Sequence, residues 1–166
     1  MTTSAQVAAG PYIANVEEQQ QIEWLSGHPV SVLLDSATTA GQLMVLRSTP
    51  PAGSASPMHV HGREDEVFIM ISGEALVVVG DQTRELHAGG VAFLPREIPH
   101  AYRITADAHM LTICTPGGLE QFFRTAGHDL SQPKPQGWTI TPESMAAALT
   151  PLGGRILGPP PAPAQH

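Results

Sequence analysis

The sequence has few of the features that would tie a protein to a membrane, to nucleic acid or to an oxidising compartment. Its only cysteine is Cys114, which excludes an internal disulfide and a multi-cysteine zinc site. Eight Lys and Arg against fifteen Asp and Glu give a net charge of −7, whereas binding nucleic acid requires clustered cations. No apolar run approaches the ~18 residues of a membrane span, and Met1–Gly10 lacks the basic start of a secretory signal. We therefore expect a cytoplasmic protein with no membrane or nucleic-acid partner.

Charged residues are also scarce, at 14% of the chain, whereas glycine and proline occur 16 times each. Many turns and few charged helices favour a β-rich domain. A chain of 166 residues matches one domain, and it can bury a core without covalent staples.

Short apolar stretches separated by turn residues fill the middle of the chain, and they predict a β-barrel over residues 30–115. The predicted strands are 30–34, 42–48, 66–71, 75–79, 83–87, 91–94, 101–105 and 110–114. A turn at 72–74 separates the third strand from the fourth, and Gly80-Asp81 forms a tight hairpin. The predicted fold class is all-β, with short C-terminal helices.

Three further segments flank the predicted barrel. Residues 1–29 form a polar N-terminal arm, 116–157 a helical extension, and 158–166 a tail rich in proline and alanine. The extension contains two predicted helices, the second starting at the N-cap Thr141. We expect this second helix to pack on the outer wall of the barrel rather than over its mouth.

The stretch between residues 53 and 66 carries the chemistry. His59 and His61 are two positions apart, so on an extended segment both imidazoles point to one face. Glu66 follows at an odd offset, so a bend at Gly62 is needed to turn it inward. Asp65 and Glu64 are also acidic, but the strand alternates inward from Glu66. Two imidazoles and a carboxylate are typical ligands of a divalent first-row metal.

His100 is the best candidate for a fourth ligand, because it follows the turn-rich segment 93–99 and precedes a strand. The sequence therefore predicts one divalent transition metal per chain, held by His59, His61, Glu66 and His100. This ligand set suits iron, nickel, cobalt, manganese, copper or zinc. Glu66 is either a plain ligand or also a catalytic base that accepts a proton from a substrate hydroxyl.

Several apolar or aromatic residues near these positions are expected to fill the core or to line a substrate pocket. They are Phe68, Met70, Phe93, Tyr102 and Met110. Four other histidines lack ligand spacing and are expected at the surface. They are His28, His87, His109 and His128.

The motif resembles that of the cupins, a superfamily of small β-barrel proteins. The first cupin motif, G-x5-H-x-H-x3/4-E-x6-G, is met by Gly53, His59, His61, Glu66 and Gly73. The second, G-x5-P-x-G-x2-H-x3-N, is met in part, by Gly89, Pro95 and His100. In this second motif Glu97 replaces a glycine and Ile104 the final asparagine.

The chain is further similar to single-domain bacterial cupins of the quercetin 2,3-dioxygenase-like group. That resemblance implies a jelly-roll-like barrel, a metal on three histidines and one glutamate, and a homodimer. It also implies a small-molecule substrate and O2 as partners, with ring cleavage of a flavonol-like or other enolic or phenolic compound. Fold alone does not fix function. The alternatives are a non-oxidative isomerase or cyclase of secondary metabolism, and a metal-containing small-molecule-binding cupin without catalysis.

Overall fold

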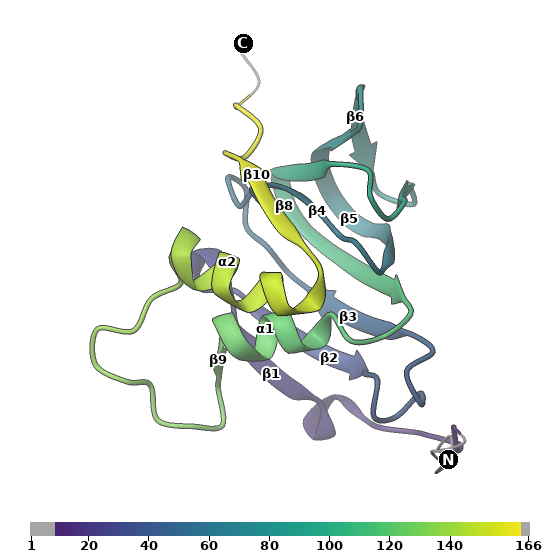
Figure 1. Cartoon of the computed structure of the whole chain (residues 1–166), viewed down its shortest axis with the longest axis vertical. Coiled ribbons are helices and arrows are strands. Elements are labelled where there is room, and N and C mark those ends of the chain that lie inside the picture. The colour runs from purple at the N-terminus through teal and green to yellow at the C-terminus, as the bar shows by residue number, and fades with distance from the viewer. Residues whose placement is uncertain (1–8, 164–166) are drawn as a thin grey trace, which may run out of the picture.

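A computed structural model gives the structure of the protein and describes residues 9–163. Within these residues the chain forms one antiparallel sheet of ten strands, which curls without closing into a ring (Figure 1). One path through the sheet runs in the order β10-β4-β8-β3-β2-β1-β9, and β5 pairs with β6, β7 and β8. The strands are β1 (Gln20–Glu23), β2 (Pro29–Leu34), β3 (Met44–Ser48), β4 (Met58–Val60), β5 (Asp65–Val79), β6 (Gln82–His87), β7 (Val91–Leu94), β8 (His100–Thr115), β9 (His128–Asp129) and β10 (Arg155–Gly158). The prediction of an all-β fold is confirmed.

Two short helices, α1 (Glu120–Ala126) and α2 (Pro142–Leu149), lie side by side in front of β1, β2 and β3 (Figure 1). The predicted start of α2 is confirmed, because the Thr141 side chain accepts a hydrogen bond from the Ser144 amide at 3.1 Å. Three 3-10 turns complete the described elements: η1 (Val16–Glu18), η2 (Leu25–Gly27) and η3 (Thr150–Leu152). No helix among residues 9–163 is long and apolar enough to cross a membrane.

The long strands β5 and β8 pair along almost their full lengths, from Asp65 opposite Thr115 to Val79 opposite His100. The predicted turn at residues 72–74 is therefore wrong, and so is the break between strands 101–105 and 110–114. The register shifts between Met70 and Ala75, so the turn-forming residues there produce bulges inside a continuous strand. Bulges bend and twist a strand, and this bend lets the sheet curl.

The sheet extends beyond residues 30–115 at both ends. β1 lies in the predicted N-terminal arm and pairs with β2, while β10 lies in the C-terminal part and pairs with β4. The predicted division of the chain into four segments stays a prediction. Residues 1–8 of the arm and 164–166 of the tail lie outside the described residues.

The buried apolar residues form two clusters. The first joins β1, β2 and β3 to the two helices, and its members include Trp24, Leu46 and Leu149. The second lies inside the curl of β5, β6, β7 and β8, around Phe68 and Met70. The metal-ligand candidates lie beside these two clusters, so apolar side chains surround a small group of polar side chains.

Gly73 provides a test of the bulge in β5. Its φ is +85°, and a Cβ atom there would lie 2.2 Å from the Asp107 carbonyl oxygen. We expect Gly73→Ala to lower the free energy of unfolding by about 2–4 kcal/mol, from backbone strain plus the clash. Gly89→Ala is the matched control, because Gly89 has a φ of +82° and open space around it. Gly89→Ala should lower the free energy of unfolding by about 1 kcal/mol. Chemical denaturation of the metal-free proteins measures both values. Equal losses would contradict the role assigned to the close approach at Gly73.

Candidate metal centre and adjoining cavity

The short strand β4 and the bend after it position His59 and His61. β4 is hydrogen-bonded on both sides, since His59 lies opposite His100 of β8 and opposite Ile156 of β10. The chain then bends at Gly62, whose amide donates to the Gly153 carbonyl at 3.1 Å. A Cβ atom on Gly62 would lie 2.5 Å from that carbonyl oxygen, so the bend depends on a glycine through close packing.

After the bend, β5 alternates between a buried and a more exposed face, and Glu66, Phe68 and Met70 are on the buried face. Asp65 points the other way and pairs with Arg96 at 2.9 Å. Among the acids of this stretch, the structure therefore brings Glu66 to the histidines and Asp65 to the surface. Glu64, by contrast, is buried, at 1% exposure, outside the cluster that Glu66 joins.

β7 and the loop after it position His100. Leu94 of β7 lies opposite Glu66 in β5, and residues 95–99 then lead to the first residue of β8. The loop is held by a hydrogen bond from the Glu97 amide to the His61 carbonyl at 2.7 Å. Glu97 itself has a φ of +64°, the conformation that the glycine of the second cupin motif would favour. His100 is 1% exposed.

These local arrangements bring His59, His61, Glu66 and His100 together. One potential ligand atom from each lies within 4.8 Å of all the others. The Glu66 Oε2 atom is 3.1 Å from His100 Nε2 and 3.5 Å from His61 Nε2. Such spacing is that of donors facing a common centre. The cluster is compatible with one metal ion.

The hydrogen-bonding state of these atoms supports the fit. Among the described residues, His61 Nε2, His100 Nε2 and Glu66 Oε2 are buried atoms without a hydrogen-bond partner. Leaving polar atoms unpaired in a protein interior costs free energy, and native proteins usually satisfy them. A cation bound between the three atoms would satisfy all of them at once.

The protonation states also suit metal binding. Burial, followed by the neighbouring His100 and His61, lowers the pKa of His59 to about 3, so its imidazole is neutral at physiological pH. Burial works to raise the pKa of Glu66, but the imidazoles of His100 and His61 outweigh it and hold the pKa below its ordinary value. The centre thus offers a carboxylate and a neutral imidazole, which are the forms that ligate metals.

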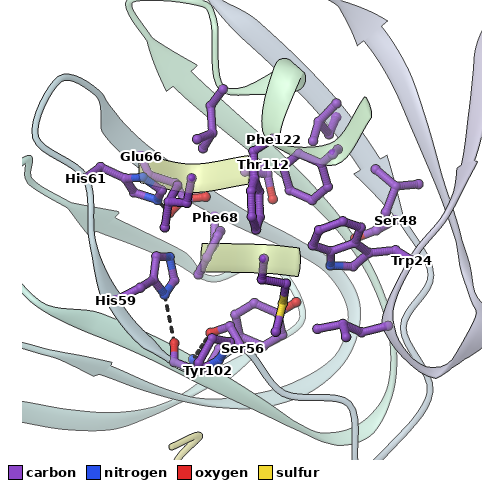
Figure 2. Close-up of a pocket in the computed structure, with 18 of the residues that line it drawn as sticks. Trp24, Ser48, Ser56, His59, His61, Glu66, Phe68, Tyr102, Thr112 and Phe122 are labelled. Carbon is purple, nitrogen blue, oxygen red and sulfur yellow. Dashed lines mark hydrogen bonds and ion pairs between the residues drawn. The ribbon is translucent and has the colours of Figure 1, made fainter. Parts of the chain in front are cut away.

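A mostly apolar cavity extends from this cluster into the region beneath the helices. Figure 2 shows His59, His61 and Glu66 gathered on one side of it, and Trp24 with Ser48 on the other. Its volume is about 70 Å³. A small number of polar groups interrupts the apolar wall, which is the usual composition of a small-molecule site. These groups are His28, Ser48, Ser56, Tyr102 and Thr112.

Three of the five predicted pocket residues line this cavity: Phe68, Tyr102 and Met110. Met70 is fully buried in the second core cluster instead. Phe93 lies on β7 with 59% of its surface exposed, on the outer face of the sheet. Neither side chain lines the cavity: Met70 lies farther along the same buried face of β5, and Phe93 is on the outer face of the sheet.

Other cavity residues come from segments that the sequence did not associate with the site. Trp24 precedes η2, Phe122 lies on α1, and Met145 and Leu149 lie on α2. The expectation that α2 packs on the outer wall, away from the mouth, is therefore wrong. Neither His28 nor His128 is at the surface as expected, since they are only 6% and 9% exposed. His28 lines the cavity. No motif spacing identifies these residues, because only the tertiary structure places them next to β4 and β5.

The chain is similar to known proteins in sequence and in fold. Residues 46–116 match the family model described as the cupin domain. Quercetin 2,3-dioxygenase of Bacillus subtilis (strain 168) is 29% identical over 123 residues, which are 72% of this chain and 35% of that protein. The chain thus spans about a third of the length of this curated relative.

Solved structures of other proteins share the fold. KdgF from Halomonas sp. matches with a TM-score of 0.58 and 18% identity, over 68% of this chain and 98% of the other. An RmlC-like cupin from Shewanella frigidimarina matches with a TM-score of 0.57 and 20% identity, over 67% of this chain and 96% of the other. At such low identity these likenesses concern the fold alone.

The cluster predicts a metal-dependent increase in stability. A metal that binds only the folded protein stabilises it by about 2.7 kcal/mol at a hundredfold excess over its dissociation constant. We expect metal removal by a chelator to lower the melting temperature of the wild type, and His61→Ala to abolish most of that difference. His87→Ala is the control, because the His87 side chain is 59% exposed and remote from the cluster. Full metal content in His61→Ala would refute the ligand assignment.

Proposed function

Because this chain belongs to the cupin superfamily, we propose that it is a metal-dependent dioxygenase that cleaves a flavonol-like or other enolic or phenolic substrate with O2. One observation carries the proposal. A mostly buried cluster of three imidazoles and a carboxylate opens onto an apolar cavity that His59, His61 and Glu66 line. The identity to quercetin 2,3-dioxygenase of Bacillus subtilis adds support for the reaction class.

Under this proposal the donors of one divalent transition metal are His59, His61, Glu66 and His100. The metal would supply Lewis-acid activation of a substrate oxygen. The residues of the chain would accept the substrate proton and bind the substrate. Glu66, which lines the cavity, would accept the proton of the substrate hydroxyl. Phe68, Met110 and the aromatic residues beneath the helices would hold the body of the substrate and exclude water.

The size of the cavity bears on the choice of substrate. Its volume of about 70 Å³ is roughly half that of an engineered apolar cavity that holds benzene. Binding a compact enol would therefore require only a small expansion of the cavity. A flavonol, with its three rings, would require an outward movement of the helices. We propose that α1 and α2, which cover the cavity, move to admit the larger substrates. A screen should accordingly contain both flavonols and compact β-diketones.

Oxygen uptake with such a panel tests the reaction class, and Glu66→Gln tests the base. Glutamine keeps an oxygen that can contact the metal but removes the proton acceptor. We expect activity per bound metal to fall by about 10²–10⁴ in Glu66→Gln, while the metal content falls only in part. Glu66→Asp, which keeps a carboxylate with a shorter reach, should retain more activity than Glu66→Gln.

Three outcomes would contradict parts of the proposal. Equal activity per bound metal in the wild type and both variants would leave Glu66 as a ligand only. Turnover without oxygen consumption would point to an isomerase or cyclase instead of a dioxygenase. Binding of panel members without any turnover would indicate a small-molecule-binding cupin.

We also propose that the protein is a homodimer. The outer face of the sheet exposes large apolar residues, including Ile71 on β5 and Val91 and Phe93 on β7, at 47%, 66% and 59% exposure. The extended segment before η1 exposes Tyr12 and Ile13, at 46% and 92%. Large exposed apolar patches are typical of interfaces, and a two-fold dimer would bury the same patch on both copies.

Light scattering at micromolar concentration should give a particle of twice the 17.5 kDa chain mass. The double variant Val91→Asp with Phe93→Asp should shift the protein towards the monomer without changing its metal content, because neither side chain contacts the cluster. Leu130→Asp serves as the control, since Leu130 is 49% exposed on a different part of the surface. A wild-type particle of 17.5 kDa would disprove the dimer.

A further inference from the structure

The turn that joins β1 to β2 contributes to the side of the cavity opposite the metal-ligand candidates. The Trp24 amide donates to the His28 carbonyl at 2.9 Å, and the Gly27 amide donates to the Trp24 carbonyl at 3.0 Å. Ser26 and Gly27 have φ values of +64° and +72°, so the chain reverses tightly between Trp24 and His28. In Figure 2 Trp24 lies across the cavity from His59. The side chains of Trp24 and His28 both line this cavity.

His28 brings an unsatisfied ring nitrogen to the cavity wall. The residue is 6% exposed, and its buried Nδ1 atom has no hydrogen-bond partner among residues 9–163. Burial lowers the pKa of His28 below its ordinary value, against the opposing effect of the Leu25 backbone. The ring is therefore neutral at physiological pH, and a neutral imidazole offers one N–H donor and one nitrogen acceptor. Because native proteins usually satisfy buried polar atoms, the unpaired Nδ1 indicates a partner that the chain itself does not supply.

The other polar groups of the cavity wall do not provide that partner. The Ser56 hydroxyl accepts a hydrogen bond from the Tyr102 amide at 3.0 Å. Ser48 lies opposite Val30 in the β2–β3 pair, and Figure 2 shows it on the same side of the cavity as Trp24. Its hydroxyl makes no hydrogen bond to the unpaired nitrogen of the histidine. The side remote from the metal-ligand candidates is thus apolar apart from a few polar groups that a bound molecule could use.

We propose that His28 is a substrate-binding residue, whose imidazole forms a hydrogen bond with a hydroxyl group at the end of the substrate remote from the metal-ligand cluster. A hydroxyl group suits this place because it can either donate to a neutral imidazole or accept from it. An anionic group suits it less, since a neutral ring among apolar side chains does not compensate a charge. The inference rests on the proposed function in that a substrate occupies the cavity, but it does not depend on the consumption of O2.

The test uses two pairs of probes whose members differ by one hydroxyl group. The flavonol pair is 3-hydroxyflavone and 3,4′-dihydroxyflavone, and the compact pair is 1-phenylbutane-1,3-dione and its 4-hydroxyphenyl analogue. In each pair the additional hydroxyl lies at the far end of the phenyl ring, away from the oxygen atoms that would face the metal. Calorimetry at fixed pH and without O2 gives the dissociation constants for the Co²⁺-loaded protein, so turnover does not affect the comparison.

Three variants are compared with the wild type. His28→Phe keeps an aromatic ring but removes both ring nitrogens, whereas His28→Gln keeps one donor group and one acceptor. His128→Phe is the matched control, because His128 is 9% exposed and does not line the cavity. The Co²⁺ content of each protein is measured as well, since neither histidine belongs to the metal-ligand cluster.

We expect the wild type to bind the hydroxylated member of at least one pair about 3–10-fold more tightly, which is the usual effect of one hydrogen bond between neutral groups. In His28→Phe the two members should bind equally, because the partner of the hydroxyl group is removed. His28→Gln should keep part of the preference, and His128→Phe should keep all of it. The Co²⁺ content should be the same in all four proteins. The ratio within a pair cancels any general change in cavity shape.

Equal affinities within both pairs for the wild type, or no binding of any probe, would overturn the inference. A preference that persists in His28→Phe would also overturn it, since another residue would then bind the hydroxyl group. If His28→Phe does not fold or binds neither member, the smaller side chain of His28→Leu decides between the same outcomes. The expected ratios without O2 uptake in air would refute the dioxygenase and leave this inference standing, whereas O2 uptake without a preference would do the reverse.

Discussion

The antiparallel pairing of β5 with β8 is the interaction on which the other features of the molecule depend. It runs from Asp65 opposite Thr115 to Val79 opposite His100, and bulges around Gly73 allow the paired strands to bend. Because side chains alternate along a strand, this one register turns Glu66, Phe68 and Met70 inward together. β8 also pairs with β3 and with β4, so the same strand connects the core under the helices to the histidines. Changing the register by one residue would turn Glu66 away from the cluster.

The interior beside this pairing combines apolar packing with a small group of polar atoms. These atoms have no hydrogen-bond partner within the protein. Three potential ligand atoms and the carboxyl group of Glu64 are buried without partners. Burying such groups opposes folding, and the convergence of the three ligand atoms is consistent with a centre selected for ligation and not for stability. The same arrangement makes folding and metal binding interdependent: the cation would stabilise the fold, and the fold determines where each donor lies.

The cavity beside this centre is formed by segments from both ends of the described chain. Trp24 and His28 approach from the N-terminal side, and Met145, Leu149 and Ile156 from the C-terminal side. β10 fulfils two roles, because it pairs with the histidine-bearing strand β4 and places Ile156 in the cavity wall. The segments outside residues 30–115 thus complete a cavity wall to which the central strands also contribute, through Leu46, Phe68 and Met110 among others.

The sequence by itself determined the fold class and the four residues of the cluster, because these depend on short-range spacing. It also determined the hairpin at Gly80-Asp81 and the helix start at Thr141, because these depend on local turn and cap chemistry. It failed at residues 72–74, because a glycine within a bulge looks like a glycine within a turn until the partner strand is known. Only the tertiary structure decided that His28 is buried, that α2 covers the cavity and that Phe93 faces outward. It also decided that Glu64 is buried. Each of these placements results from contacts between segments distant in the chain, which local periodicity does not encode.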